Sequence, residues 1–455
     1  MTNENKKELK KDSEDEVKSE ENANYKKQKP IYKTSIVNEY GMCEMAYNKK
    51  ENRTYYVAMN KETKQISDYE KYIINKKDVS PLPPDHMLLT KNVILFPEKA
   101  EDYGSEDELL EDIQNFIHKY LDISLFYEKI ATYYVLLTWL YDKFNEIPYL
   151  RTIGDYGSGK SRFLQTIGSL CYKPIFTGGA TTVSPIFRIL DETNGTLVMD
   201  ESDFRFSDMT SDMIKILNTG YQKGMSVLRS EGKGVFEVKA YNVYSPKIIA
   251  TRELFKDQAL ESRFLVEEMG NGKVRDDVPI SLDEEFHDEA QKIRNKMLKW
   301  RLDNFFEDHS VKGIEKIKNI HPRLNQIIVP LLSIIKSDEI KKDLRKFIIK
   351  YHKNLVADRG LSWESDIVYA ILKIKHSKAK TEMTMKEISE EVNFEMDIGE
   401  SITSRKIGWY VRNKLQLKTD KKRNGFVLST IINDKKLMGW KDRFGITDKE
   451  LEIDD

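Results

Sequence analysis

The stretch GDYGSGKS, residues 154–161, fits the pattern G-x-x-x-x-G-K-[ST] at every specified position, which are Gly154, Gly159, Lys160 and Ser161. Glycines leave room for backbone N–H groups to turn toward phosphate oxygens, and a helix that begins after such a loop adds the positive end of its dipole. In this pattern the lysine reaches the terminal phosphates and the hydroxyl binds Mg²⁺. A flexible glycine-rich turn without a ligand is the alternative.

The sequence on both sides of the loop favours phosphate binding. PYLRTIG, residues 148–154, has the composition of a short buried strand, and RFLQTIGSL, residues 162–170, has the pattern of a helix. A loop between a strand and a helix is the context that the pattern requires. We therefore predict that ATP and Mg²⁺ bind here. The predicted nucleotide contacts are Gly154, Gly157, Ser158, Gly159, Lys160, Ser161 and Arg162.

A second stretch adds carboxylates to this site. TLVMDESDF, residues 196–204, reads as an apolar strand that ends in Asp200 and Glu201, with Asp200 lying 40 residues after Lys160. In a nucleotide-hydrolysing site, Asp200 would hold Mg²⁺ through water, with Ser161 as the other metal ligand, and Glu201 would polarise the attacking water. Buried strands often end in acids, so this pattern gains its specificity from the glycine loop.

Together these motifs resemble the P-loop NTPases, and a later stretch extends the resemblance to the AAA+ branch of that family. KIIATRE, residues 247–253, is another apolar strand with a polar end. Thr251 matches the sensor-1 position of AAA+ proteins, where a polar side chain contacts the γ-phosphate or the attacking water. An ordinary strand end is the alternative.

The stretch QALESRFLVEEM, residues 258–269, places Arg263 at the end of a helix and just before a strand. This position matches the arginine finger of AAA+ proteins, which stabilises transition-state charge on the ATP of a neighbouring subunit. Arg252 is the competing candidate, and a surface arginine near a strand is the alternative without a function. The resemblance therefore implies a homo-oligomeric ring, which we expect to be a hexamer.

The resemblance also implies a fold for about residues 120–350. It predicts an α/β P-loop AAA+ core, with a parallel five-stranded sheet between helices, followed by a helical lid. Helical patterns over residues 281–306 and 323–336 place the lid within residues 281–355. Arg323 would then be the sensor-2 arginine of the lid.

Residues 224–246, GMSVLRSEGKGVFEVKAYNVYSP, alternate around EGKG and predict a β-hairpin with Lys233 near its tip. A hairpin inserted before sensor 1 resembles the pre-sensor-1 hairpin of one AAA+ clade. In helicases of that clade, of the MCM and viral superfamily 3 types, a basic tip faces the central pore and grips DNA. The alternatives are a simple extension of the sheet edge and a hairpin that handles another substrate.

The C-terminal part predicts three helices, at 365–375, 384–395 and 401–416, followed by a two-stranded wing over 417–430. This is the winged helix-turn-helix pattern. Residues 401–425 contain eight basic residues and a single acid, Asp420. Such an excess of positive charge suits contacts with a phosphate backbone. The basic residues are Arg405, Lys406, Arg412, Lys414, Lys418, Lys421, Lys422 and Arg423. A protein-interaction module is the alternative.

The composition of the whole chain limits other functions. Over 455 residues, 74 Lys and Arg balance 75 Asp and Glu, so any field that attracts nucleic acid is local. The two cysteines, Cys43 and Cys171, do not have the spacing of a disulfide framework or a zinc site. Without an apolar run of membrane-spanning length, we expect a cytoplasmic protein with no membrane partner.

These observations predict several domains and one leading function. The expected segments are a disordered charged tail (1–30), a small N-terminal β-rich module (31–100), the AAA+ ATPase core (101–270), the helical lid (271–355), the C-terminal winged helix (356–440) and a tail (441–455). The leading hypothesis is an ATP-dependent DNA helicase or translocase that replicates a mobile element such as a plasmid or phage, with single-stranded DNA in the pore and duplex at the winged helix. The alternatives are an AAA+ DNA-binding switch in transposition, repair or defence, and a protein-remodelling ATPase.

Overall fold

The computed structural model describes residues 31–74, 77–178, 181–200, 207–231, 237–255, 258–270, 274–317, 320, 322–360, 363–395, 402–422, 425–448 and 451. The predicted tail 1–30 and the predicted functional residues Glu201, Lys233 and Arg423 lie outside the described residues. The chain divides into two compact units. The first contains Met1–Lys316 and Pro322–Lys336, and the second contains Ile317–His321 and Ser337–Asp455.

The centre of the first unit is a five-stranded sheet in which every pairing is parallel, as the sequence predicted. Its strands lie in the order β14-β8-β13-β10-β9. Their bounds are β8 (Tyr149–Ile153), β9 (Ile175–Thr177), β10 (Leu197–Asp200), β13 (Lys247–Thr251) and β14 (Phe264–Glu268). Strands this apolar are typical of parallel sheets that are covered on both faces. The order places β13 between the strand before the glycine loop and the strand that ends in Asp200.

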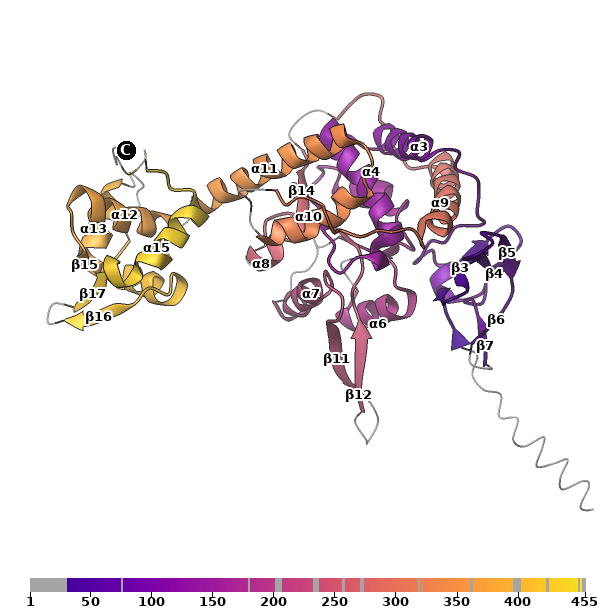
Figure 1. Ribbon diagram of the computed structural model, residues 1–455, viewed down its shortest axis with the longest axis horizontal. Coiled ribbons are helices and arrows are strands. Elements are labelled where there is room, and N and C mark those ends of the chain that lie inside the picture. Colours follow the sequence, from indigo (N-terminus) through magenta and orange to yellow (C-terminus); the bar gives the residue numbers. More distant parts are fainter. Residues whose placement is uncertain are drawn as a thin grey trace, which may run out of the picture. The chain divides into compact units, whose positions relative to one another are not determined.

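Helices pack around this sheet (Figure 1). They are α3 (Glu106–Tyr120), α4 (Leu125–Leu140), α5 (Lys160–Gly168), α6 (Val183–Thr193), α7 (Ser207–Thr219), α8 (Gln258–Glu261), α9 (Glu284–Asn304) and α10 (Pro322–Ile334). Helix α3 begins with a capping box: Ser105 Oγ accepts from Glu108 N at 3.2 Å, and Glu108 Oε2 accepts from Ser105 N at 3.1 Å. The sheet and its helices fit an α/β P-loop core.

The N-terminal module, which the sequence predicted to be β-rich, has seven short strands among its described residues. They are β1 (Ile31–Tyr32), β2 (Ser35–Val37), β3 (Gly41–Asn48), β4 (Arg53–Asn60), β5 (Ile66–Tyr69), β6 (Tyr72–Ile74) and β7 (Lys77–Ser80), followed by α2 (Met87–Thr90). One sheet has the order β2-β3-β4-β5 and the other β1-β7-β6. Buried side chains of β3 and β4, such as Met45 and Tyr56, share one hydrophobic cluster with Tyr149 and Ile249 of the central sheet.

Buried charges also join this module to the core. Glu44 on β3 accepts from Lys173 Nζ at 2.9 Å and from Arg301 Nε at 2.8 Å. Tyr172 donates its hydroxyl proton to the same carboxylate. Arg301 also pairs with Asp142 at 2.7 Å. Because a buried charge is costly unless it is paired, this network favours one position of the module against the core.

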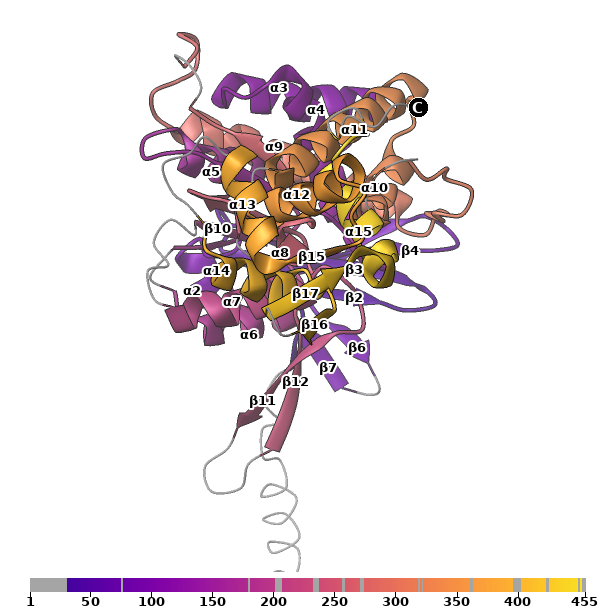
Figure 2. The ribbon, with the colours of Figure 1, turned by 90° about the vertical axis from the view of Figure 1, so that its left-hand side faces the viewer.

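The predicted hairpin is present as β11 (Ser226–Glu231) and β12 (Glu237–Asn242), an antiparallel pair in which Arg229 lies opposite Lys239. It leaves the core between α7 and β13 and extends away from the central sheet in both views of the ribbon (Figures 1 and 2). Its residues 232–236, which contain Lys233, lie outside the described part of the chain.

The second unit contains helices and a small antiparallel sheet of order β15-β17-β16. Its elements are α11 (Asp338–Gly360), α12 (Trp363–Ser377), β15 (Glu382–Thr384), α13 (Met385–Glu395), α14 (Ser404–Trp409), a π-helix (Tyr410–Lys414), β16 (Thr419–Lys422), β17 (Gly425–Ser429) and α15 (Thr430–Phe444). The three predicted helices and both predicted strands are present. The sequence missed β15, α15 and the change to π-helical geometry after Trp409. Within the described ranges of both units, no helix is long and apolar enough to cross a bilayer.

Candidate nucleotide site

The glycine loop has a backbone that side chains would obstruct. Gly157 and Gly159 have φ angles of 79° and 93°, in the left-handed region that favours glycine. A Cβ atom on Gly154 would lie 2.4 Å from Ser158 Oγ and 2.8 Å from the carbonyl oxygen of Met269. Gly159 is also the N-cap of α5, so the first free N–H groups of that helix follow the loop directly. The loop therefore has the geometry that phosphate binding by backbone N–H groups requires.

Lys160 is buried within this loop. Its Nζ donates to the carbonyl oxygens of Gly154, at 2.7 Å, and Asp155, at 2.6 Å. Burial lowers the pKa of the Lys160 ammonium, and the nearby Asp200 acts in the opposite direction. The ammonium is thus fixed inside the loop, where the predicted contact with terminal phosphates would form.

The two sequence motifs meet at their hydroxyl and carboxylate. Ser161 Oγ donates to Asp200 Oδ2 at 3.3 Å, although the residues lie on α5 and at the end of β10. An adjacent hydroxyl and carboxylate are hard oxygen ligands of the kind that Mg²⁺ prefers, so these residues fit the predicted metal. The next residue, Glu201, is the predicted base and lies outside the described residues.

The strand between the two motifs brings Thr251 and Arg252 next to the loop. Thr251 is the register partner of Ile153 in β8, and its carbonyl oxygen accepts from Gly154 N at 3.4 Å. The Thr251 hydroxyl donates to the carbonyl oxygen of Glu253 at 3.0 Å, whereas Arg252 lines the cavity beside the loop. The predicted sensor strand is therefore adjacent to the loop. The sensor-1 candidate Thr251 is its last residue, and the competing finger candidate Arg252 follows directly.

A cavity of about 1120 Å³ lies against the loop. Its walls are residues 153–159, the segment 121–124 that precedes α4, the end of β14 with the two residues after it (267–270), and residues 274–276 and 278–280 farther along the chain. Arg162, a predicted nucleotide contact, also lines it and donates to the carbonyl oxygens of Pro279 and Ile280, both at 2.6 Å. Its guanidinium therefore positions one wall of the cavity.

Sequence reasoning missed the walls that face the loop. Arg275 anchors one of them, since its backbone N–H donates to Asp122 Oδ2 at 2.9 Å and its guanidinium donates to the carbonyl oxygen of His118. Glu267 Oε1 accepts from Ser124 N at 3.0 Å and ties the end of β14 to the start of α4. These contacts span about 140 to 160 positions of sequence and follow no short motif, so no local signal announces them.

Arg263 and Arg323 lie together at a different place. The Arg263 guanidinium is 4.4 Å from the ring centroid of Tyr221 and donates to Asn218, and the residue is only 5% exposed. Burial, and then the neighbouring Arg323, lower the pKa of Arg263. Arg323 Nη1 is 3.4 Å from Ser262 Oγ. Among the described residues, neither arginine lines the cavity beside the glycine loop.

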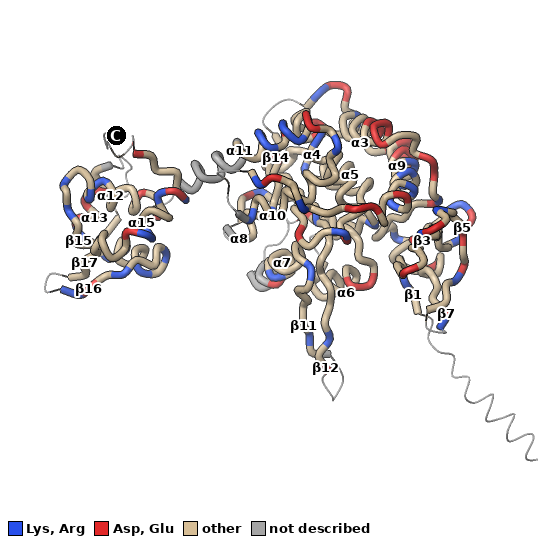
Figure 3. The backbone as a smooth tube through the Cα atoms, viewed as in Figure 1, with Lys and Arg blue, Asp and Glu red and all other residues tan. Residues whose placement is uncertain are grey.

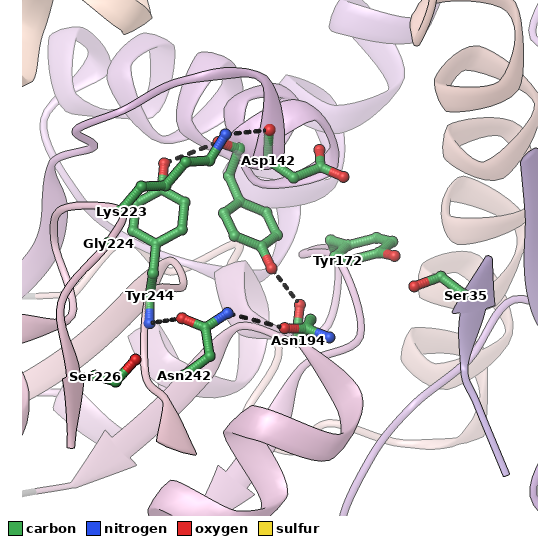
Figure 4. A pocket seen from close by; sticks show the side chains of 10 residues that line it. Ser35, Asp142, Tyr172, Asn194, Lys223, Gly224, Ser226, Asn242 and Tyr244 are labelled. Atoms are coloured by element: carbon green, nitrogen blue, oxygen red, sulfur yellow. Dashed lines mark hydrogen bonds between the residues drawn. The ribbon is translucent and has the colours of Figure 1, made fainter. Parts of the chain in front are cut away.

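The root of the hairpin contains a second, smaller cavity of about 420 Å³ (Figure 4). Lys223 donates to the carbonyl oxygen of Asp142 at 2.5 Å, and the Tyr244 hydroxyl donates to the carbonyl oxygens of Tyr141 and Phe144. Nearby, the buried Lys247 Nζ donates to four oxygens at the ends of α7 and β12. The Lys247 bonds join the segments before β11 and after β12 to β13, the strand that reaches the glycine loop.

In the second unit, Arg405, Lys406, Arg412, Lys421 and Lys422 are all exposed. β16 ends in two consecutive lysines, Lys421 and Lys422, and Figure 3 shows Lys and Arg in blue at this strand. Lys422 pairs with Glu382 on β15 at 2.6 Å. The structure thus gathers the predicted basic residues on one small unit, separate in sequence from the nucleotide site.

The glycine loop, the Ser161–Asp200 contact and the parallel sheet together fit an α/β P-loop core. No protein-family model matches this chain, and no curated protein sequence matches it. Solved structures similar to it include two apo structures of the NrS-1 C-terminal region, each 14% identical, covering 85% of this chain and 96% or 95% of that chain, with TM-scores of 0.34 and 0.35. AMPPCP-bound DnaA from Aquifex aeolicus is 13% identical, covers 70% of this chain and 93% of that chain, and has a TM-score of 0.19. At such low values, function has to be inferred from the geometry of the site.

Proposed function

We propose that this chain is an AAA+ ATPase that moves or unwinds DNA during replication of a mobile element. The observation that carries the ATPase part is the Ser161–Asp200 contact of 3.3 Å, which joins the two motifs on either side of β13. A glycine-rich turn without a ligand gives no reason for a hydroxyl and a strand-end carboxylate to meet there. The order β14-β8-β13-β10-β9 supports the AAA+ assignment, because it puts a polar strand end between the two motifs.

The residues of the chain have distinct roles in this proposal. Backbone N–H groups of the loop and Lys160 would bind the phosphates, and Ser161 and Asp200 would hold Mg²⁺. When bound, Mg²⁺ supplies positive charge that offsets charge developing on the transferred phosphoryl group. Glu201 would accept a proton from the attacking water, and Thr251 would orient that water.

The position of Arg263 supports a ring of several subunits. Arg263 lies away from the cavity of its own chain, as a residue that acts on a neighbouring subunit must. Because Arg263 is packed on Tyr221, it would have to leave this contact to reach the neighbour. We propose a homo-hexamer in which Arg263 acts in trans, and in which α9 and α10 belong to a helical lid that carries Arg323.

The DNA part rests on the hairpin and on the second unit. The segments before and after the hairpin are bonded through Lys247 to β13, so movement at the end of this strand would reach the hairpin. We propose that Lys233 at the tip contacts single-stranded DNA in the pore. In the second unit, α12, α13, α14 and the β16–β17 wing would form a winged helix whose basic residues contact DNA phosphates.

The decisive experiment is the steady-state ATPase rate without DNA, with single-stranded DNA and with duplex, using Lys160→Ala as the blank. We expect DNA to stimulate turnover, because a DNA motor couples hydrolysis to its track. A strand-displacement assay then separates a helicase from a DNA-binding switch that does not unwind. ATPase activity that neither DNA changes would contradict the proposal and favour a protein-remodelling ATPase.

A further inference from the structure

We infer that the second unit carries a stacking surface for single-stranded DNA, formed by Trp409, Arg412, Lys414, Lys421 and Phe426. We call it the aromatic–basic face. The inference rests on the proposed function, in that DNA is the partner, and it names the form of DNA that this unit takes. It departs from the duplex contact that the basic sequence alone suggested.

The first component is an exposed tryptophan with a cation beside it. Trp409, the last residue of α14, is 49% exposed although it is a large apolar side chain. Lys414 Nζ lies 5.9 Å from its ring centroid, and Tyr410 packs edge-on against it at 5.2 Å. These contacts fix the orientation of the indole and leave about half of its surface to solvent.

The second component is a phenylalanine on the wing. Phe426 on β17 is 39% exposed, and the Arg412 guanidinium lies 4.4 Å from its ring centroid. Gly408 leaves space for this arrangement, because a Cβ atom there would lie 3.1 Å from Arg412 Nη1. Lys421 is the register partner of Phe426 across the β16–β17 pair, so both side chains lie on the same side of the sheet.

The cations of this face have no acidic partners within the described parts of the chain. Arg412, Lys414 and Lys421 make no ion pair with a described carboxylate, whereas the adjacent Lys422 pairs with Glu382. Positive charges without an acidic partner attract phosphates, and binding of a nucleic-acid phosphate releases the counterions around it. Exposed rings, in contrast, gain little from phosphates and need an apolar or π surface to cover them.

Single-stranded DNA satisfies both requirements at once. Its unpaired bases expose their faces for stacking on aromatic rings, and the phosphates of its backbone can contact the cations beside those rings. In a duplex the bases are stacked on one another, so Trp409 and Phe426 would remain uncovered. Two exposed rings, each with a cation beside it, therefore match a short single strand better than a duplex backbone.

The test is fluorescence-anisotropy binding of the full-length chain to an oligothymidine strand and to a duplex of equal length. Trp409→Ala and Phe426→Ala should each weaken single-strand binding about 5- to 150-fold, the range for losing one stacked base. Duplex binding should change by less than about twofold, because phosphate contacts remain. Trp409→Phe should restore single-strand affinity, which a loss of folding would not allow.

A matched control is available on the same unit. Phe394 on α13 is 82% exposed, and no described Lys or Arg lies over its ring. Phe394→Ala should leave both affinities unchanged. Unchanged single-strand binding in Trp409→Ala and Phe426→Ala, or an equal loss for duplex, would overturn the inference.

Failure of the inference and failure of the proposed function give different results. If the wild-type chain binds DNA and its ATPase responds to DNA while the ring variants bind normally, only the aromatic–basic face is wrong. If the wild-type chain binds neither DNA and its ATPase ignores both, the DNA function itself is wrong. Loss confined to single strands in the ring variants supports both.

Discussion

The first unit buries Lys160, Lys173 and Arg301 against fixed acceptors, whereas the second unit exposes Arg412 and Lys421. The same residue types thus serve two purposes. A buried cation has lost its hydration and needs exact partners, so it fixes geometry. An exposed cation keeps its hydration and is held loosely, so it can attract a mobile polyanion. Substitutions in the first unit should therefore affect turnover or stability, and those in the second unit should affect DNA binding.

The largest effect is expected at the glycine loop. Lys160→Ala removes the buried ammonium that the loop carbonyls hold, so ATP turnover should fall to background. The measurement is steady-state phosphate release at saturating ATP. Phe394→Ala is the control, because it changes an exposed ring in the other unit. Near-normal turnover in Lys160→Ala would rule out the P-loop assignment.

Arg263 gives the next effect. As a trans-acting finger, Arg263→Ala should lower turnover about 1000-fold. Because Arg263 also packs on Tyr221, the loss alone does not separate catalysis from folding. Mixing Arg263→Ala with Lys160→Ala chains should restore some activity, since each variant supplies the half-site that the other lacks. A mixture as inactive as its components would contradict action in trans.

The buried network of the N-terminal module should affect stability rather than turnover. Glu44→Ala leaves Lys173 and Arg301 without their shared carboxylate, and we expect a loss of about 3–5 kcal/mol in the free energy of unfolding. Urea unfolding followed by circular dichroism measures it. Glu62→Ala, in an exposed turn, should change the midpoint little. Equal midpoints for both variants would mean that the network does not hold the module.

Lys173 predicts a dependence of stability on pH. Burial lowers its pKa to about 8, although Glu44 acts in the opposite direction. Between pH 8 and the ordinary lysine pKa, the unfolded chain binds more protons than the folded one. The free energy of unfolding should therefore rise with pH in that window, by at most about 1.4 kcal/mol per unit from this group.

Lys173→Met should remove this contribution, whereas Lys129→Met, which changes an exposed lysine of α4, should keep it. The comparison uses the difference between each variant and the wild type at each pH, so that other alkaline titrations cancel. A wild-type slope that persists in Lys173→Met would show that another group is responsible.

The smallest effect is expected from a single exposed cation. Lys421→Ala should weaken binding to single strands and duplexes alike by a few-fold at moderate salt, because it removes one phosphate contact. The slope of log affinity against log salt should fall by about one. Anisotropy titrations at several salt concentrations measure it. A loss restricted to one DNA form would mean that Lys421 does more than neutralise a phosphate.

Much of the fold could be predicted from the sequence. The hairpin follows from alternation around a short turn, whereas the parallel five-stranded sheet is what the resemblance to AAA+ proteins implies, and both are present. The added strand β15 and the closing helix α15 were missed. β15 has only three residues, and α15 has few apolar positions on one side, so neither gives a clear periodic signal.

The glycine loop and the carboxylate that meets it could both be recognised from the amino-acid sequence. Binding of phosphate by backbone N–H groups needs glycines at set intervals next to a lysine and a hydroxyl. All of these residues lie within one short stretch of sequence, so a motif can identify them. The walls of the cavity, the Glu44 network and the aromatic–basic face could be recognised only in the folded chain. These depend on side chains that are distant in sequence, and their contacts arise when buried charges need partners and when strands and helices pack.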